Sequence, residues 1–135
     1  MIFLDTNIFL YAVGAPHPRR SVCADLLRRV GGGSVPAITN TEVVQEILHV
    51  YSRRGDRGKG LMVARDIASL FLGLLPVTRK DAFRACDLMQ RYPAVGPRDA
   101  IHAATMLSNG IEKIASLDPD FDVIREIERV PPERV

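Results

Sequence analysis

Apolar residues follow two patterns along this chain, and each pattern predicts a different kind of element. Short continuous apolar runs between polar residues are typical of buried strands, whereas apolar positions that recur every three or four residues are typical of amphipathic helices. The runs predict strands over residues 2–4, 35–39, 74–77, 113–117 and 128–130. The helical spacing predicts helices over residues 19–30, 61–72, 81–92 and 98–109, and one more that Asn40 or Thr41 caps and that ends near Arg53, Arg54 and Gly55.

The order of these elements predicts the fold class. Strands alternate with helices, and the strands are continuously apolar, which indicates a parallel sheet covered on both faces. We therefore expect an α/β fold, a three-layer α/β/α sandwich with a mainly parallel sheet of four to five strands. The 135 residues are expected to form one domain, residues 1–135, with a flexible connector at residues 31–34 and a loose tail over the last five residues.

Composition excludes several classes of protein. Hydrophobic residues make up 47% of the chain and charged residues 25%, a balance typical of a folded globular domain. No apolar run approaches the roughly 20 residues of a membrane span, and Asp5 interrupts the N-terminal apolar stretch where a signal peptide would continue. We expect a cytoplasmic protein with no membrane contact, and we expect Cys23 and Cys86 to be core residues rather than metal ligands or a disulfide.

Charge changes this picture only slightly. The formal net charge of +2 is too small to indicate a nucleic-acid ligand by itself, but 15 of the 18 basic residues are arginine. The planar guanidinium group forks onto phosphates and carboxylates better than the lysine ammonium group does. The arginines therefore fit an RNA or DNA ligand, or an acidic protein partner, without choosing between them.

Four acidic residues stand where a parallel sheet would bring side chains together. Asp5 directly follows the first strand, and Asp118 follows the strand over residues 113–117. Glu46 lies one to two turns into the helix after the second strand, and Asp99 lies in the first turn of the helix before that later strand. Ligands of open parallel sheets bind beyond the carboxyl ends of the strands, so all four side chains could face one site.

Clustered carboxylates repel one another unless a cation neutralises them, and Mg²⁺ or Mn²⁺ prefers carboxylate oxygens and water. Each acid also has an ordinary structural explanation. Asp99 could complement the helix dipole, Asp118 could belong to a turn, and Glu46 could be an exposed helix residue. Asp5 is hardest to explain in this way, because a carboxylate directly after a buried strand needs partners.

Four segments resemble motifs of the PIN-domain nucleases. They are Asp5-Thr6-Asn7 after the first strand, VVQEIL at residues 43–48, RDAIHAAT at residues 98–105 and SLDPDF at residues 116–121. The last two are similar to the D-A-x-x-A-A helix and the S/T-x-D-x-D-F strand end of that family. The resemblance spans residues 2 to about 124, and it lies in the order and spacing of the segments more than in any single one. The short chain is also similar to the toxins of VapBC-type toxin–antitoxin pairs.

The resemblance implies metal ligation and catalysis by Asp5, Glu46, Asp99 and Asp118, with Mg²⁺ or Mn²⁺ as cofactor. It also implies supporting roles for Asn7, Ser116 and Asp120. Two positions raise questions: Glu42 lies one helical turn before Glu46 and could take its place, and Leu117 stands where the family often has a polar residue.

The implied activity is the hydrolysis of RNA phosphodiester bonds, with arginines at positions 19, 20, 53, 54 and 57 as candidate backbone contacts. The implied partners are an antitoxin and a second copy of the chain in a homodimer. Residues 61–72 carry more apolar surface than one core-facing stripe requires, which favours an interface there, although deep burial would explain the same pattern.

Parts of the sequence also fit three other functions. Glu46-x-x-His49 and Asp99-x-x-His102 imitate the paired motifs of di-iron bundles, but the interspersed strands oppose four long helices, and we expect both histidines to be packed or surface residues. A phosphatase with Asp5 as nucleophile is also conceivable, but Asn7 stands where the haloacid-dehalogenase pattern needs a second Asp. A non-catalytic PIN-like module that binds RNA or a protein partner remains the alternative, although the presence of all four acids favours a nuclease.

Overall fold

A four-stranded parallel sheet lies at the centre of the computed structural model, which describes residues 1–135. The strands are β1 (Ile2–Leu4), β2 (Ala37–Ile38), β3 (Lys113–Ala115) and β4 (Glu128–Val130), in the spatial order β2-β1-β3-β4. Phe3 of β1 is paired with Ile38 on one side and Ile114 on the other, so β1 is a central strand. Its three residues are all buried, as the continuous apolar run predicts.

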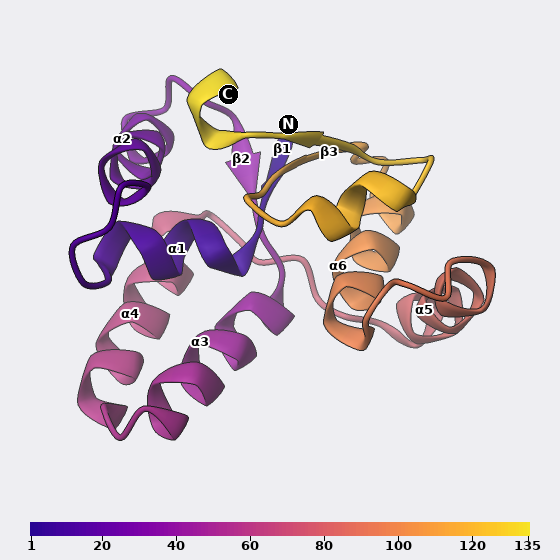
Figure 1. Ribbon diagram of the computed structural model, residues 1–135, viewed down its shortest axis with the longest axis horizontal. Coiled ribbons are helices and arrows are strands. Elements are labelled where there is room, and N and C mark those ends of the chain that lie inside the picture. The colour runs from indigo at the N-terminus through magenta and orange to yellow at the C-terminus, as the bar shows by residue number, and fades with distance from the viewer.

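Six α-helices and two short 3₁₀-helices surround the sheet. They are α1 (Thr6–Val13), α2 (Arg20–Gly31), α3 (Thr41–Arg53), α4 (Arg57–Leu70), α5 (Arg79–Arg91), α6 (Pro97–Ser108), η1 (Pro119–Val123) and η2 (Pro132–Arg134). Figure 1 shows α1 and α2 on one side of the strands and α5 and α6 on the other, with α3 and α4 beyond the strand ends. The expected three-layer arrangement and parallel sheet are confirmed.

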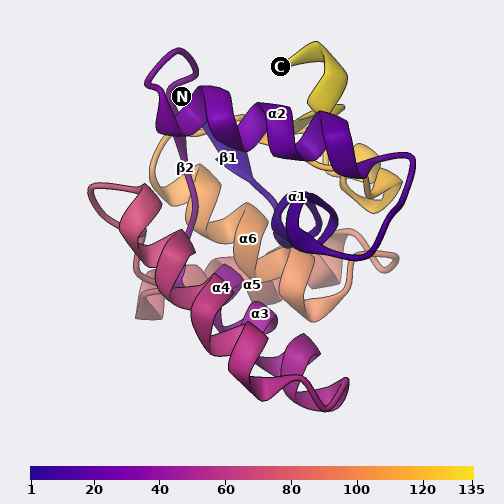
Figure 2. The same cartoon turned by 90° about the vertical axis from the view of Figure 1, so that its left-hand side faces the viewer.

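The direction of the crossovers explains the two helical layers. The chain moves from β1 to β2 in one direction across the sheet, then passes β1 again to reach β3 in the opposite direction. Parallel crossovers are almost always right-handed, so connections that run in opposite directions lie on opposite faces. Figure 2, which faces the side of α1 and α2, accordingly shows α6 behind the strands.

The predicted strand over residues 74–77 is wrong. Only an isolated parallel bridge between Asn40 and Leu75 forms there, with Leu75 N–H donating to the Thr39 carbonyl and Thr41 N–H donating to the Leu75 carbonyl. Pro76 follows directly and has no N–H to extend the ladder. The sheet therefore has four strands, the lower of the two expected numbers.

Helix α1 has no counterpart in the sequence prediction. Its residues Thr6–Val13 are mostly apolar, so no polar face marks a helical period. Asp5 begins the helix, because its Oδ1 accepts a hydrogen bond of 2.7 Å from the Thr6 N–H. The chain thus turns from strand to helix at this one acidic residue.

The last five residues are also not a loose tail. Pro132 is buried, and the residues around it form η2. Arg29 of α2 donates a hydrogen bond of 2.9 Å to the Val135 carbonyl, and Arg19 lies 3.1 Å from Glu133. The glycine run after α2 forms a turn in which Gly33 adopts a φ of 77°, and Gly32 N–H bonds to the Arg28 carbonyl.

The core is a single cluster whose largest fully buried side chains are Phe3, Phe9 and Phe121. Cys23 belongs to it, but Cys86 is exposed, which corrects the expectation for that residue. On α5 the buried positions are Asp81, Ala85 and Leu88, and Cys86 lies off that face. None of the helices has the length and apolar character to cross a membrane.

Candidate functional site

The carboxyl ends of β1 and β3, the middle of α3 and the first turn of α6 supply the predicted acidic residues. Asp5 follows β1, and Ser116 and Asp118 follow β3. Because β1 and β3 are parallel neighbours, their carboxyl ends meet at one edge of the sheet. Asp99 lies in the first turn of α6, after Pro97 at the start of that helix.

Asp5 is held by three hydrogen bonds. Besides the Thr6 N–H at Oδ1, its Oδ2 accepts from Asn7 Nδ2 at 2.9 Å and from Ser116 Oγ at 2.6 Å. The residue is only 5% exposed. Burial raises the pKa of Asp5, and the Glu46 charge adds to that effect, while His102 and the Ser116 hydroxyl oppose it. The carboxylate is therefore oriented, yet its charge is poorly compensated.

Asn7 and Ser116 tie the two strand ends together. Asn7 Nδ2 donates to Ser116 Oγ at 3.1 Å, and Ser116 Oγ accepts from the Asp118 N–H at 3.0 Å. The Asn7 side-chain oxygen accepts from the Leu117 N–H at 3.3 Å. Because Leu117 contributes its backbone to this network, the contact does not need a polar side chain at position 117.

Asp99, Asp118 and Asp120 form the tightest group of acids. One carboxylate oxygen from each lies within 4.8 Å of the others. Burial, followed by the charges of Asp5 and Asp118, raises the pKa of Asp99 to about 7. A bound cation would stabilise the ionised form of Asp99 next to the neighbouring carboxylates. The surroundings of Asp99 therefore favour cation binding.

Glu46 faces this cluster from α3, and its partner is a histidine. The side chain is buried, and its Oε1 lies 2.7 Å from His102 Nε2 of α6. Burial opposes protonation of His102, but the Glu46 hydrogen bond and the Asp5 charge outweigh it, so the pKa of His102 is raised. The expectation that His102 is a packed residue holds, since it is fully buried, but this contact to Glu46 was not predicted.

Glu42 differs from Glu46 in its surroundings. It is half-buried and forms no hydrogen bond or ion pair through its side chain. The charge of Glu46, but not that of Glu42, is among those that raise the pKa values of Asp5 and Asp99. Of the two helix acids, Glu46 is therefore the one that lies toward the other carboxylates.

The donor set fits a hard divalent cation. Its atoms are carboxylate oxygens from strand ends and two helices, and burial together with neighbouring carboxylates raises the pKa values of Asp5 and Asp99. Asp5 and Glu46 are not in the tightest group, but both act electrostatically on Asp99. Mg²⁺ and Mn²⁺ favour such oxygen ligands and keep waters in the remaining positions.

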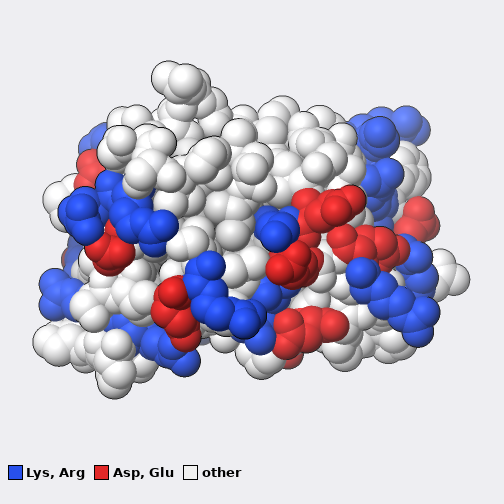
Figure 3. Space-filling view, turned by 90° about the horizontal axis from the view of Figure 1, so that it is seen from above, with Lys and Arg blue, Asp and Glu red and all other residues white.

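The five arginines named as candidate backbone contacts come from two parts of the chain, the start of α2 and the turn between α3 and α4. Arg19 is paired with Glu133 near the end of the chain. Arg53, Arg54 and Arg57 lie exposed around the turn between α3 and α4, and none forms an ion pair. Figure 3 shows basic and acidic side chains mixed in a band beside a broad area without charge, so the face seen there has no uniformly basic patch.

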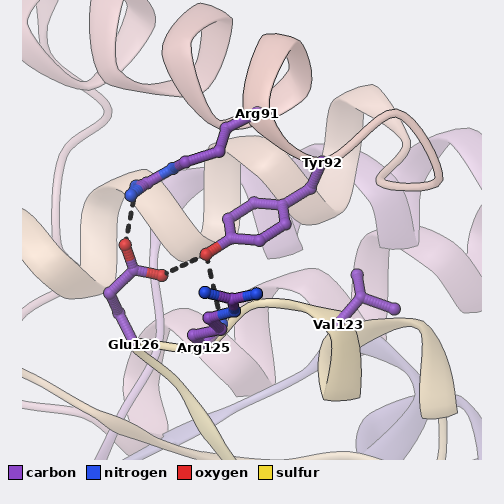
Figure 4. Close-up of a pocket in the computed structure, with 5 residues that line it drawn as sticks. All are labelled: Arg91, Tyr92, Val123, Arg125 and Glu126. Atoms are coloured by element: carbon purple, nitrogen blue, oxygen red, sulfur yellow. Dashed lines mark hydrogen bonds and ion pairs between the residues drawn. The ribbon is translucent and has the colours of Figure 1, made fainter.

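The most spacious pocket lies away from the acids. It measures about 520 Å³ and is lined by Arg91, Tyr92, Val123, Arg125 and Glu126. Figure 4 shows the Tyr92 hydroxyl reaching Glu126, with a hydrogen bond of 2.8 Å, while Arg91 forms an ion pair of 2.6 Å with the same carboxylate. These contacts join the end of α5 to the chain before β4 and pair the Glu126 carboxylate with Arg91 and Tyr92.

Comparisons with known proteins bear on the fold and the family. The family model described as PIN domain matches residues 2–127. Ribonuclease VapC13 of Mycobacterium tuberculosis is 36% identical over 131 residues, which cover 96% of this chain and 99% of the relative.

Two solved structures share the fold. The crystal structure of VapC20 of Mycobacterium tuberculosis, titled a Sarcin-Ricin loop cleaving toxin, aligns with a TM-score of 0.77 at 22% identity, covering 93% of this chain and 95% of that one. VapBC2 of Rickettsia felis, solved bound to a DNA fragment from its promoter, aligns with a TM-score of 0.75 at 16% identity, covering 97% and 98%.

Proposed function

The chain belongs to the PIN-domain family, and from this premise we propose that it is a Mg²⁺- or Mn²⁺-dependent endoribonuclease and the toxin of a type II toxin–antitoxin pair. The observation that carries the proposal is the group formed by Asp99, Asp118 and Asp120, in which one carboxylate oxygen from each lies within 4.8 Å of the others. Burial and the charges of Asp5 and Asp118 raise the pKa of Asp99 to about 7, which agrees with a site for a cation. A relative with 36% identity over nearly the whole chain is named a ribonuclease. On this proposal, the substrate of the present chain is cytoplasmic RNA.

Asp5, Glu46, Asp99 and Asp118 are the proposed metal ligands, and Asp120 is close enough to Asp99 and Asp118 to assist. A bound ion supplies an activated water and neutralises charge on the leaving oxygen. Around it, Asn7 and Ser116 fix the orientation of Asp5. His102 fixes Glu46 through one carboxylate oxygen and leaves the other free to face the cluster.

Neither the Ser116 hydroxyl at the site nor the Cys23 thiol on α2 is arranged as a nucleophile. Ser116 Oγ is buried and already donates to Asp5 while accepting from Asn7 and the Asp118 N–H. Cys23 is buried, and burial raises the pKa of its thiol to about 11. Hydrolysis by water is the reaction that these side chains support.

The proposal is tested with end-labelled RNA and the purified chain. Cleavage is expected with Mg²⁺ or Mn²⁺, and EDTA should abolish it. Asp99→Asn should remove cleavage in the presence of the metal, because it replaces a carboxylate at the most crowded point of the cluster. Cleavage that persists in EDTA or in the Asp99→Asn variant would exclude a metal-dependent site at these acids.

An antitoxin and a second copy of the chain are the proposed partners. Leu61 and Met62 of α4 are 39% and 56% exposed, and Leu72 just after α4 is fully exposed, so part of the predicted surplus apolar surface does face solvent. Sedimentation of the pure protein should show a dimer at micromolar concentration, and adding the product of the neighbouring gene should increase the mass. A monomer whose mass does not increase when the product of the neighbouring gene is added would contradict both the homodimer and the antitoxin complex.

A further inference from the structure

A second pocket begins at the edge of the acidic site and extends away from it. It has a volume of about 380 Å³, and its lining includes Asn7, Leu10 and Tyr11 of α1, Gly14 and His17 of the following loop, and Arg54 at the end of α3. Asn7 belongs to both places, because its side chain also donates to Asp5. A molecule whose reacting group lies at the acids would therefore reach this pocket with its neighbouring part.

Two aromatic rings form one wall of the pocket. The centroids of Tyr11 and His17 lie 4.6 Å apart, with the ring planes inclined by 45°. His17 Nδ1 accepts a hydrogen bond of 3.1 Å from the Arg19 N–H, which fixes the ring and leaves its other nitrogen free to donate. Aromatic faces arranged in this way provide a surface on which a nucleobase can stack.

The chain after α1 can form this wall because residue 14 is glycine. A Cβ at Gly14 would lie 2.6 Å from the Leu10 carbonyl oxygen, so any other residue would force the backbone apart. The loop therefore turns closely against the end of α1, which keeps His17 beside Tyr11. The position of the wall therefore depends on the backbone at Gly14 as well as on the half-buried Tyr11 ring and the exposed His17 ring.

The charge of the pocket separates it from the others. Arg54 is its only charged lining residue, whereas the two pockets beside α5 include Glu126 and the pocket beside α4 includes Asp66. Arg54 forms no ion pair, and its guanidinium lies 5.7 Å from the Tyr51 ring centroid. A guanidinium group without an ion pair that lines the same pocket as Tyr11 and His17 suits a ligand that combines an anionic group with a flat ring.

We propose that this pocket binds one nucleotide of the RNA next to the scissile phosphate, with its base against Tyr11 and His17 and its phosphate at Arg54. The pocket would then set the sequence preference of cleavage at that nucleotide. This inference rests on the proposed ribonuclease function, because it places the nucleotide relative to the acidic site. It adds a base-binding subsite to residues that make no contact with the proposed metal ligands, apart from the shared Asn7.

A binding experiment tests the subsite without any cleavage. The probe is the monophosphate of a fluorescent purine ribonucleoside, which has no internucleotide bond, titrated with the full chain in Mg²⁺. Stacking should quench the probe, and the absence of tryptophan leaves its signal clear. Tyr11→Leu and His17→Ala should each weaken binding by about tenfold or more, while Tyr11→Phe should retain it. Arg54→Gln should weaken binding of the probe and of inorganic phosphate.

Phe83 and Arg79 of α5 are the matched control. They form a similar aromatic–cation pair, with the guanidinium carbon 4.9 Å from the ring centroid, outside the larger pockets. Phe83→Leu and Arg79→Gln should leave probe binding unchanged. His17 is exposed, so His17→Ala should fold. This variant therefore tests the subsite even if Tyr11→Leu does not fold.

Three results would overturn the proposal: no quenching, equal loss in the control variants, or binding of the nucleotide no tighter than that of inorganic phosphate. The first would leave the pocket as a candidate contact for a protein partner instead. Failure of this inference is distinct from failure of the proposed function. If the chain binds the probe as described but does not cut RNA, the subsite is supported and the proposed nuclease function is wrong. If the Tyr11→Leu and His17→Ala variants cut RNA as well as wild type, only the proposed subsite is wrong.

Discussion

Glu46 and Glu42 lie one helical turn apart on α3, but only Glu46 is buried and hydrogen-bonded to His102. Glu46→Gln keeps the volume and can still accept from His102, so the fold should persist while a proposed metal ligand is lost. We expect kcat/KM for RNA to fall by more than about 100-fold, since even partners that only orient a ligand are worth 10- to 100-fold. Glu42→Gln is the matched variant, and it should cleave within about threefold of wild type. If Glu42→Gln abolished cleavage and Glu46→Gln did not, the metal ligand on α3 would be Glu42, one helical turn earlier.

The acids of the site could be predicted from the sequence because strand ends leave a readable signal. Asp5 interrupts an apolar run, and Asp118 follows another, so the parallel sheet itself brings them together. The contact between His102 and Glu46 could not be predicted in this way. The two residues are separated by 56 positions, and their pairing depends on how α3 packs against α6.

At the scale of elements, helix and strand prediction failed where local signals were weak. Helix α1 has an apolar residue at almost every position, so the helical period is hidden, and only the cap at Asp5 marks its start. The segment around Leu75 has the composition of a strand, but Pro76 ends the ladder after one bridge. Where amphipathic spacing is strong, as in α3 and α5, the predicted and observed helices agree within about two residues at each end.

Helices α1, α2 and α4 line a pocket of about 150 Å³ whose residues are apolar apart from Asp66, and we expect the proposed antitoxin to bind over it. The pocket includes the buried Phe9, Val63 and Ile67, and its rim is formed by the half-buried Val13 and Leu27. An amphipathic helix of the partner would place its apolar side chains there. Leu27→Glu should weaken antitoxin binding by at least about tenfold, because binding of the partner would bury the new charge against apolar side chains.

Met89→Glu is the control for that experiment, since Met89 is an exposed apolar residue of α5, on the other side of the sheet. Met89→Glu should melt like wild type, whereas Leu27→Glu should melt lower because Leu27 packs against the core. At a temperature where both variants are folded, only Leu27→Glu should change the antitoxin titration measured by calorimetry. Equal affinities for wild type and Leu27→Glu would place the antitoxin elsewhere.

For the whole molecule, the acidic site is a source of instability that depends on pH. Burial and mutual repulsion raise the pKa of Asp99 to about 7, and they raise the pKa of Asp5 as well. Between the ordinary carboxyl pKa and these raised values, the folded chain binds more protons than the unfolded chain. The free energy of unfolding must then decrease as pH rises.

His102 also makes the free energy of unfolding decrease as pH rises. The acids with lowered pKa values affect stability only at lower pH. The raised pKa of His102 means that the stability it contributes is present below its ordinary pKa and is lost as pH rises through the folded value. Asp81, Asp122, Glu126 and Glu133 have lowered pKa values, so the stability that they contribute is lost only as pH falls through the acidic range. The acidic site therefore governs the pH dependence near neutrality.

We expect the melting temperature in EDTA to fall as pH rises from about 5.5 to about 8, measured by circular dichroism. Mn²⁺ should raise it more at the higher pH, because protons no longer compete with the ion for the carboxylates. Asp99→Asn should melt above wild type in EDTA at the higher pH, since it removes a repelling charge, and should lose part of the gain from Mn²⁺. Asp122→Asn is the contrasting variant: it breaks the ion pair of 2.8 Å with Arg129, so it should not raise the melting temperature. A melting temperature in EDTA that is constant over this range, or an Asp99→Asn variant that melts below wild type there, would mean that the carboxylates do not repel one another in the folded chain.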